Sequence, residues 1–424
     1  EGSYNGAGYI KLYFNTPTCT YRTVNPNTGK DLIYICDKGN NQVVVLDATT
    51  YDSTLGTYEV YQVLTKPEDE LDESISFVPK KVITDIQGRF YVIVENETFG
   101  IMQFSIEGKF DRYTGTNPIT LTPWEIFWRN FSSEEQLSTQ KTLNNIAFNS
   151  IVYSKEDFMI YTTSLAIENK NGTLNDKVMI KKINPSGDDI LRRNGYNVPM
   201  GDVKYVTTRD WNNSSTTPSQ LVGITVNDYG VYSVIDQSKG RIFTYDTEGN
   251  LLYISGEKGS LSNSLNQPVA IQYLTIESTD TKAKQELVLV LDKTSKSIIT
   301  YSTSDFGALV NKATKLYLEN DIIGAEEYWR EVVKMNSNYE LGYVGIGKSL
   351  LRQEKFEEAM EYFKLGHNSV YYSKAYQQYR DIVLKENFSL IMSGLVITGV
   401  GLCVLFFFKY QNKKKIGYKK EGGK

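Results

Sequence analysis

Residues Tyr229–Leu252 read YGVYSVIDQSKGRIFTYDTEGNLL, two short apolar strands joined by a polar turn. The first strand ends in Asp236, and the second runs into a turn with the sequence Asp-Thr-Glu-Gly. Apolar runs of this length with turn residues between them are typical of a β-hairpin. The pattern recurs as DLIYICDKGNNQVVVLD (31–47), GRFYVIVENETFGIMQFSIEGKF (88–110) and ELVLVLDKTSKSIITYS (286–302), and more weakly over 158–184, where an Asn/Gly-rich insertion separates the strands.

The recurring hairpins predict one repeated β architecture for residues 1–303, ahead of an α-helical part. Each clear hairpin places an acidic residue after its first strand: Asp37, Glu95, Asp236 and Asp292. The first two and the last two of these acids are separated by nearly equal lengths of chain, and recurrence of a two-strand core at such a period predicts a β-propeller. Five blades are visible, and the poorly patterned residues 195–216 could hold a sixth. A strand over residues 9–14 is expected to complete the last blade and close the ring.

The segment Ile33–Val43, IYICDKGNNQV, resembles the core of an NHL repeat. Residues 9–303 thus resemble the NHL and gluconolactonase-type propellers. Six blades are common in that family, so the resemblance favours six over five. Gluconolactonase-type enzymes hold a metal with a set of Glu, Asn and Asp residues, and that set cannot be placed here. The resemblance therefore implies the fold and not the lactonase activity. The recurring acids either hold Ca²⁺ in a central channel or accept hydrogen bonds from their own turns, and the second interpretation is favoured.

The chain contains a single histidine, His367, in its helical part. One histidine cannot build a histidine-rich zinc or copper site, and this one is distant in sequence from any candidate serine of a catalytic triad. We therefore expect a protein without catalytic residues, a metal site or a cofactor.

Two insertions interrupt the predicted propeller. The first, KPEDELDESIS (66–76), is acidic but lacks the spacing of a calcium loop, so a solvated loop is expected. The second begins TPWEIFWRNF at Thr122 and carries a helix N-terminal signature, which predicts a helical insertion over 122–138. One face of this helix is aromatic and either binds a partner or packs on the propeller: Trp124, Phe127, Trp128 and Phe131.

Helical periodicity begins at Asp305 and repeats at an interval of about 34 residues. The four positions that recur are Ala313 with Gly347, Tyr317 with Leu351, Ala325 with Ala359, and Trp329 with Phe363. Residues 304–386 thus resemble tetratricopeptide repeats, and five helices are expected. Such hairpins usually bind a partner segment on their concave face. Tyr317 and Tyr343 are the candidate partner-binding residues here, and two repeats that serve only as a spacer are the equal alternative.

The segment FSLIMSGLVITGVGLCVLFFF (388–408) contains no charge and is long enough to cross a bilayer as a helix. We predict a single transmembrane helix over 387–409, running on from the preceding helix without a break. Residues 409–424 include seven lysines and one glutamate, so the tail 410–424 is expected in the cytoplasm, with the ectodomain outside. The same tail is expected to bind anionic lipid. Small residues suit close packing with another span: Gly394, Thr398, Gly399 and Gly401.

The two cysteines of the predicted propeller, Cys19 and Cys36, either form a disulfide in an oxidising compartment or remain free thiols. Cys403 lies in the apolar segment. Because the chain begins without an apolar leader, we expect that a signal peptide has been removed.

Together these features favour a noncatalytic binding and assembly subunit on a cell membrane. Bacterial surface proteins with a similar order of propeller, helical repeats and C-terminal span resemble accessory subunits of ABC-type transport systems. The resemblance implies membrane protein partners, a transporter permease among them, and no nucleic acid. Two alternatives stay open: an anchored lactonase or hydrolase with a central divalent metal, and a glycan-binding receptor or adhesin.

Overall fold

The structure is a computed structural model. It describes residues 2–3, 9–10, 13–67, 76–97, 99–115, 147–164, 167–168, 174–175, 179–195, 199–202, 207–210, 213–216, 219–259, 261, 263–277 and 284–421. The chain divides into two compact units, Glu1–Ser304 and Asp305–Lys424, which we describe separately.

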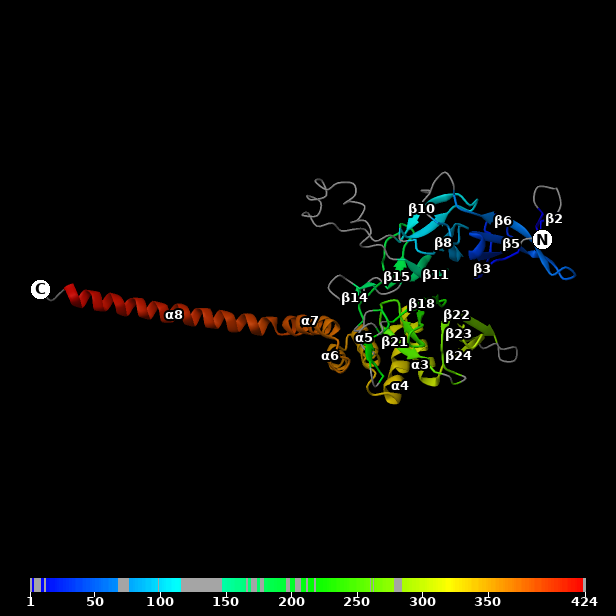
Figure 1. The fold of residues 1–424 in the computed structure, drawn as a ribbon. Coiled ribbons are helices and arrows are strands. Elements are labelled where there is room, and N and C mark those ends of the chain that lie inside the picture. The colour runs from blue at the N-terminus through cyan, green and yellow to red at the C-terminus, as the bar shows by residue number, and fades with distance from the viewer. Residues whose placement is uncertain are drawn as a thin grey trace. The chain divides into compact units, whose positions relative to one another are not determined.

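The first unit is a five-bladed β-propeller (Figure 1). Its five antiparallel sheets follow one another along the chain, and in each the strands pair in the order in which they occur. The sheets are β3 (Pro17–Val24), β4 (Asp31–Asp37), β5 (Gln42–Asp52) and β6 (Thr57–Leu64); β7 (Pro79–Thr84), β8 (Phe90–Val94), β9 (Ile101–Phe104) and β10 (Phe110–Thr114); β11 (Phe148–Ser154), β12 (Met159–Ser164) and β15 (Ile180–Ile183); β18 (Leu221–Val226), β19 (Tyr232–Asp236), β20 (Arg241–Tyr245) and β21 (Leu251–Ser255); and β22 (Pro268–Glu277), β23 (Lys284–Asp292) and β24 (Ser297–Ser302).

The hydrophobic core of the propeller lies between neighbouring blades. The first strands of successive sheets lie beside one another in the order β3, β7, β11, β18 and β22. Four apolar clusters fill the spaces between consecutive sheets, and each cluster draws side chains from both of its neighbours. Because each central strand is covered on both faces, it reads as a run of apolar residues, as in FYVIV of β8, which is buried throughout.

A repeated turn links strands within the blades. In it an Asp, Asn or Ser is followed three residues later by glycine with a positive φ, as in Asp85–Gly88 and Asp246–Gly249. The side chain of the first residue accepts main-chain N–H bonds from the turn, for example from Gln87 to Asp85 at 2.9 Å. Glycine is required because its missing Cβ permits the left-handed backbone that closes the turn.

The predicted sixth blade is not confirmed. Within residues 195–216 the structure has β16 (Thr207–Asp210) and β17 (Asn213–Thr216), which form a two-stranded sheet of their own. The sequences of these strands, TTRD and NSST, are polar and cannot supply the two apolar faces of a blade.

The strand expected over residues 9–14 does not join the last sheet. Instead β2 (Tyr9–Ile10) pairs with β1 (Gly2–Ser3), a neighbour in sequence whose pairing needs only a short loop closure. The weak hairpin over 158–184 is confirmed, because β12 pairs with β15. Its insertion contains the small hairpin β13 (Ile167–Glu168) and β14 (Leu174–Asn175).

The second unit contains six helices among its described residues. Five of them precede the apolar segment, as the sequence predicts, and each contacts the next along the chain. They are α3 (Asp305–Leu318), α4 (Ile322–Met335), α5 (Glu340–Arg352), α6 (Phe356–Leu365) and α7 (Ser369–Glu386). Side chains cap two of them: Asp321 accepts from Gly324 N–H at 2.9 Å, and Asn368 accepts from Tyr371 N–H at 3.0 Å.

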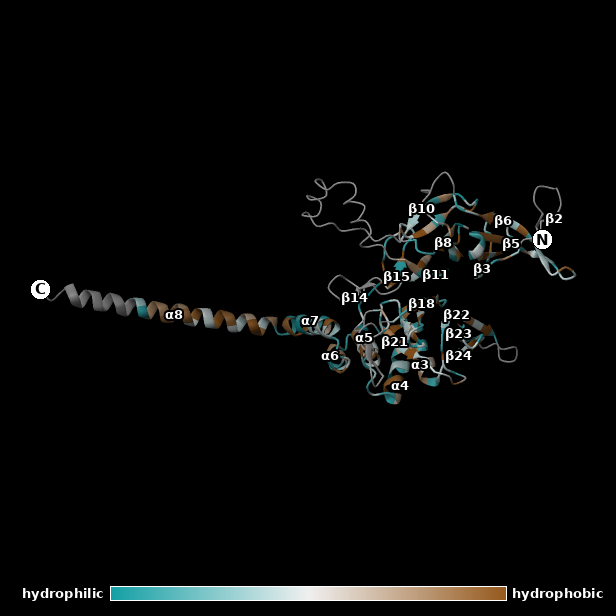
Figure 2. Cartoon of the chain, viewed as in Figure 1, coloured by the Kyte–Doolittle hydropathy of each residue, from teal (hydrophilic) through white to brown (hydrophobic). Residues whose placement is uncertain are grey.

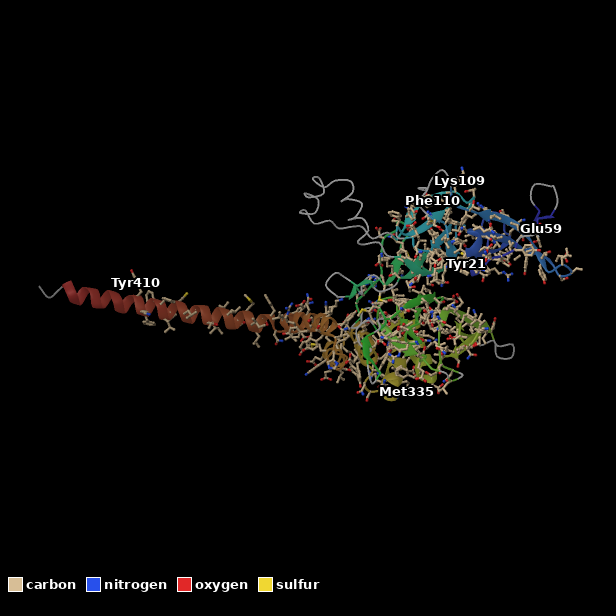
Figure 3. All side chains as sticks on the ribbon, viewed as in Figure 1. Tyr21, Glu59, Lys109, Phe110, Met335 and Tyr410 are labelled. Atoms are coloured by element: carbon tan, nitrogen blue, oxygen red, sulfur yellow. The ribbon has the colours of Figure 1, made fainter. Side chains whose placement is uncertain are left out.

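The sixth helix, α8 (Phe388–Glu421), contains the apolar segment. Within Phe388–Tyr410 the most apolar stretch of 18 residues has a mean hydropathy of 2.5, and none of that stretch is buried. Of the residues that the structure describes, only these form a helix long and apolar enough to cross a membrane (Figure 2). The side chains project on every side, with Tyr410 near the end of the apolar run (Figure 3).

A single residue, Asn387, separates α7 from α8. The prediction of an unbroken helix is therefore wrong by one residue, but the hydrogen bonding continues through the break. Asn387 N–H donates to Val383 O at 3.1 Å, and Ile391 N–H donates to Asn387 O at 2.9 Å. The Asn387 side chain also donates to Val383 O at 2.9 Å, and this bond competes with regular helix geometry at this position.

Candidate binding groove

The helical repeat places aromatic rings of one helix against glycines of another. Trp329 on α4 packs on Gly345 of α5, and Phe363 on α6 packs on Gly347 of α5. A Cβ at Gly347 would lie 2.7 Å from the Phe363 ring, so only glycine permits this approach. The close packing fixes how α5 lies against its neighbours, and it thereby positions the side chains on the other faces of α5.

Lys348 of α5 lies between two tyrosine rings from other helices. Its Nζ is 4.4 Å from the ring centre of Tyr317 on α3 and 4.7 Å from that of Tyr371 on α7. The same ammonium donates a hydrogen bond to Tyr317 Oη at 3.1 Å. Cation–π contacts of this kind hold a lysine in place.

These three residues line a groove of about 510 Å³ on the face formed by α3, α5 and α7. Its charged residues are mainly basic: Lys348, Arg352 and Lys374 against Glu354. The groove also contains apolar and amide side chains: Ile322, Leu351, Phe356, Gln377 and Gln378. An excess of basic side chains beside half-buried aromatic rings and exposed amide groups suits a ligand that carries carboxylates.

A polar network behind the groove ties α4 to α5. Glu326 on α4 accepts hydrogen bonds from Ser349 and Gln353 on α5, both at 2.8 Å. It also pairs with Arg330 at 2.6 Å, and Arg330 reaches the Tyr362 hydroxyl on α6. Burial by itself would raise the pKa of Glu326, but these hydrogen bonds outweigh it and hold that pKa below its ordinary value.

The structure places the two predicted tyrosines differently. Tyr317 lines the groove. Tyr343 is not among the lining residues: its hydroxyl donates to Ser337 O at 3.0 Å, and its ring lies beside that of Tyr362. Lys348 was not predicted from the sequence. It lies three residues before Leu351, the repeat equivalent of Tyr317, and this spacing on α5 was the available signal.

The other predicted contact residues are not brought to this site. Trp124, Phe127, Trp128 and Phe131 lie outside the described residues, as does most of the acidic insertion 66–76. The small residues of the span lie on α8, where a Cβ at Gly394, Gly399 or Gly401 would meet no atom within 4 Å. Thr398 donates a hydrogen bond to Gly394 O, and the packing of these residues against another span stays a prediction.

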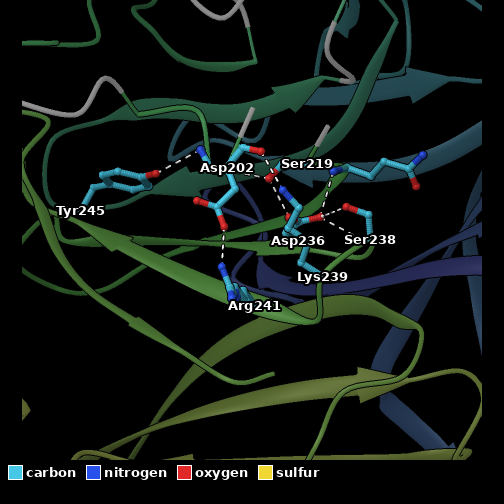
Figure 4. A network of polar contacts seen from close by, with 9 residues as sticks. Asp202, Ser219, Asp236, Ser238, Lys239, Arg241 and Tyr245 are labelled. Atoms are coloured by element: carbon cyan, nitrogen blue, oxygen red, sulfur yellow. Dashed lines mark hydrogen bonds and ion pairs between the residues drawn. The ribbon is translucent and has the colours of Figure 1, made fainter. Parts of the chain in front are cut away.

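The recurring acids serve the turns in three of the four hairpins. Figure 4 shows the network around Asp236, which accepts from the main-chain N–H of Gln220 and of Ser238, both at 2.9 Å, and from Ser219 Oγ at 2.6 Å. Asp292 likewise accepts from the N–H groups of the loop before its blade and of its own turn. Asp37 accepts from Asn15 N–H at 2.7 Å. Glu95 instead pairs with Lys38.

A second cavity lies in the propeller, between the sheets of β8 and β12. It measures about 280 Å³, and its lining includes Asp85, Arg89 and Tyr91. The Asp85 carboxylate is occupied, because Arg89 pairs with it at 2.7 Å and Tyr91 Oη donates to it at 3.1 Å. Within the described ranges, no three His, Cys, Asp or Glu side chains come together in a way that could hold a metal ion.

Comparisons with known proteins give weak structural similarity. No family model and no curated protein matches the sequence. Virginiamycin B lyase from Staphylococcus aureus aligns at 14% identity and a TM-score of 0.35, over 70% of this chain and 75% of the lyase. Hydrazine synthase from Kuenenia stuttgartiensis aligns at 11% and 0.35, over 67% and 83%. The allergen Mala s 1 of Malassezia sympodialis aligns at 12% and 0.35, over 65% and 72%. These values do not transfer an activity to this chain.

Proposed function

We propose that this protein is a noncatalytic, membrane-anchored binding and assembly subunit. In this proposal α8 crosses the membrane, the propeller and the helices α3–α7 lie outside, and the lysine-rich tail lies in the cytoplasm. The observation that carries the proposal is the basic groove of the helical unit, in which Lys348 is fixed between Tyr317 and Tyr371.

The anchor is supported by the composition of α8. Its apolar run is unburied within its own unit, so a soluble chain would expose it to water at a large cost in free energy. Seven lysines against one glutamate over 409–424 favour a cytoplasmic tail. A cell membrane of a bacterium is the setting that the resemblance of the whole chain suggests.

The groove is proposed to bind an extended or helical segment of a partner protein that carries carboxylates. The helices repeat with the period and the small-to-aromatic packing of tetratricopeptide hairpins, which supports a tetratricopeptide-like unit with a binding face. The lining of the groove contains three basic side chains and one acidic side chain, which supports an anionic partner segment.

The partner is proposed to be another subunit of a membrane complex, with an ABC-type transporter as the favoured complex. The short junction at Asn387 supports this, because hydrogen bonding that continues from α7 into α8 couples the helical unit to the span. A stiff coupling suits a subunit that sits on a membrane neighbour better than it suits a display stalk.

The test is affinity capture of the full-length protein from native membranes in a mild detergent, followed by mass spectrometry. Transporter permease or ATPase subunits should be recovered in stoichiometric amount. The double variant Lys348→Ala/Lys374→Ala should lose the partner, and Lys364→Ala, a matched change of an exposed lysine on α6 away from the groove, should retain it. Recovery of the protein alone would overturn the assembly proposal, and equal capture by both variants would exclude the groove as the contact.

A further inference from the structure

Cys19 and Cys36 lie directly opposite each other on adjacent antiparallel strands. The register of β3 and β4 pairs Cys19 with Cys36, as it pairs Tyr21 with Tyr34. Partners in an antiparallel pair have Cα atoms about 4.5–5.5 Å apart, inside the range of about 4.4–6.8 Å that a disulfide spans. Both side chains point to the face of the sheet that packs on the next blade. The two sulfur atoms can therefore be joined without moving the strands.

The surroundings make the two thiols unequal. The contact between the two sulfur atoms lowers the pKa of Cys19 and raises that of Cys36, whereas burial disfavours both thiolates. The main-chain N–H of Val82 and the ammonium of Lys81 further favour the Cys19 thiolate. Lys81 is held close by through its hydrogen bond to Ser150 Oγ at 2.7 Å.

Cys19 is also the more solvent-accessible of the two cysteines. Cys36 is completely buried, whereas Cys19 is half-buried on the first strand of its blade. A small molecule therefore reaches Cys19 first. The pair thus has the two parts that a thiol–disulfide exchange needs: an accessible thiol favoured as thiolate, and a protected neighbour that can displace the adduct.

We propose that Cys19 and Cys36 form a redox-reactive dithiol whose substrates are small disulfides. The Cys19 thiolate attacks one sulfur of the disulfide, and a mixed disulfide forms as one thiolate leaves. That thiolate takes up a proton, and Cys36 gives up its own proton and attacks the Cys19 sulfur, which releases the second thiol. The two protein thiols lose two protons and two electrons, and the disulfide is reduced to two thiols. The product covalently ties β3 to β4.

The experiment uses the full-length protein in detergent with Cys403→Ser, which leaves only the two thiols of interest. Oxidised glutathione is the disulfide. Both thiols should disappear, the intact mass should fall by two hydrogen atoms, and the peptides that contain Cys19 and Cys36 should be linked. Dithiothreitol should restore both thiols. Persistence of both thiols in the folded protein after prolonged incubation would overturn the proposal.

Single variants in the same background separate the two roles. Cys36→Ala should retain one glutathione on Cys19, because nothing remains to displace it. Cys19→Ala should leave Cys36 unreactive until the protein is denatured. Circular dichroism would establish that each variant is folded. Should either variant unfold, the link between the two peptides in the Cys403→Ser protein decides the question by itself. Equal reactivity of both single cysteines in folded variants would contradict the assignment.

Lys81→Met tests the electrostatic part of the proposal. Removal of the ammonium should move the pH profile of the Cys19 reaction to higher pH and slow the reaction several-fold at neutral pH, while the final product stays the same. A purely structural role for Lys81 would change the melting temperature but leave the pH profile in place.

Discussion

The packing of Phe363 on Gly347 gives the sharpest test of the helical unit. A Cβ at Gly347 would lie 2.7 Å from Cε1 and 2.8 Å from Cδ1 of the ring, well inside the usual carbon–carbon contact distance of about 3.5–4.0 Å. The ring cannot easily turn away, because Phe363 is completely buried and stacks on Tyr371 with ring centres 5.5 Å apart. Gly347→Ala is therefore expected to overpack the interface between α5 and α6.

Two opposing terms set the size of the effect. Overpacking a core costs about 1–3 kcal/mol, whereas alanine in a helix is favoured over glycine by about 1 kcal/mol. The expected net change is a destabilisation of up to about 2 kcal/mol. In a Phe363→Ala background, itself destabilised by about 3–5 kcal/mol, the clash is gone and only the helix preference remains. There the same Gly347→Ala change should stabilise by about 1 kcal/mol.

The assay is hydrogen exchange by mass spectrometry on the full-length protein in detergent, which reports local opening of α5. A local measure is needed because a chain of two compact units does not unfold in one two-state step and has no single unfolding free energy. Gly399→Ala on α8, where a Cβ meets nothing within 4 Å, is the control and should leave exchange in α5 unchanged. An equal effect of Gly347→Ala in both backgrounds would refute the reasoning.

Two further predictions concern carboxylates that accept several hydrogen bonds. Asp236→Ala should lower the local stability of its blade by about 1–3 kcal/mol in hydrogen exchange, because it removes the acceptor of the Gln220 and Ser238 N–H groups. The exposed Asp228→Ala should change it by less than about 0.5 kcal/mol. The pKa of Glu326 is lowered in the folded state, so its stabilising contribution is present above its unfolded pKa of about 4.3 and is lost as the pH falls below that value. As the pH falls below about 4.3, protection from hydrogen exchange in α4 and α5, measured against the intrinsic rate at each pH, should decrease more in the native protein than in Glu326→Gln. An equal decrease in both proteins would contradict this.

The recurring acidic residues of the propeller have a structural role as hydrogen-bond acceptors. Asp236 and Asp292 each accept several main-chain N–H groups, so their carboxylates are engaged in holding the loops before their blades and their own turns. A carboxylate committed in this way has little capacity to coordinate an ion. The observation supports the interpretation of these acids as turn acceptors.

The sequence alone determined the elements and their order. Apolar runs joined by polar turns, the period of the helical repeat and a long uncharged run are properties of short stretches. They predicted the blades, the five helices and the apolar helix. The number of blades was predicted less well, because the strands of residues 195–216 are polar and give a weak periodic signal. The sequence of a short polar strand does not show which other strand it will pair with.

Only the tertiary structure decided which side chains meet. Lys348 lies between Tyr317 and Tyr371 because helix packing brings three separate helices together, and Cys19 faces Cys36 because of the register of two strands. A shift of one residue in that register would turn every side chain of a strand to the opposite face. Register and helix packing depend on contacts between segments distant in sequence, so the local periodicity of the sequence cannot predict them.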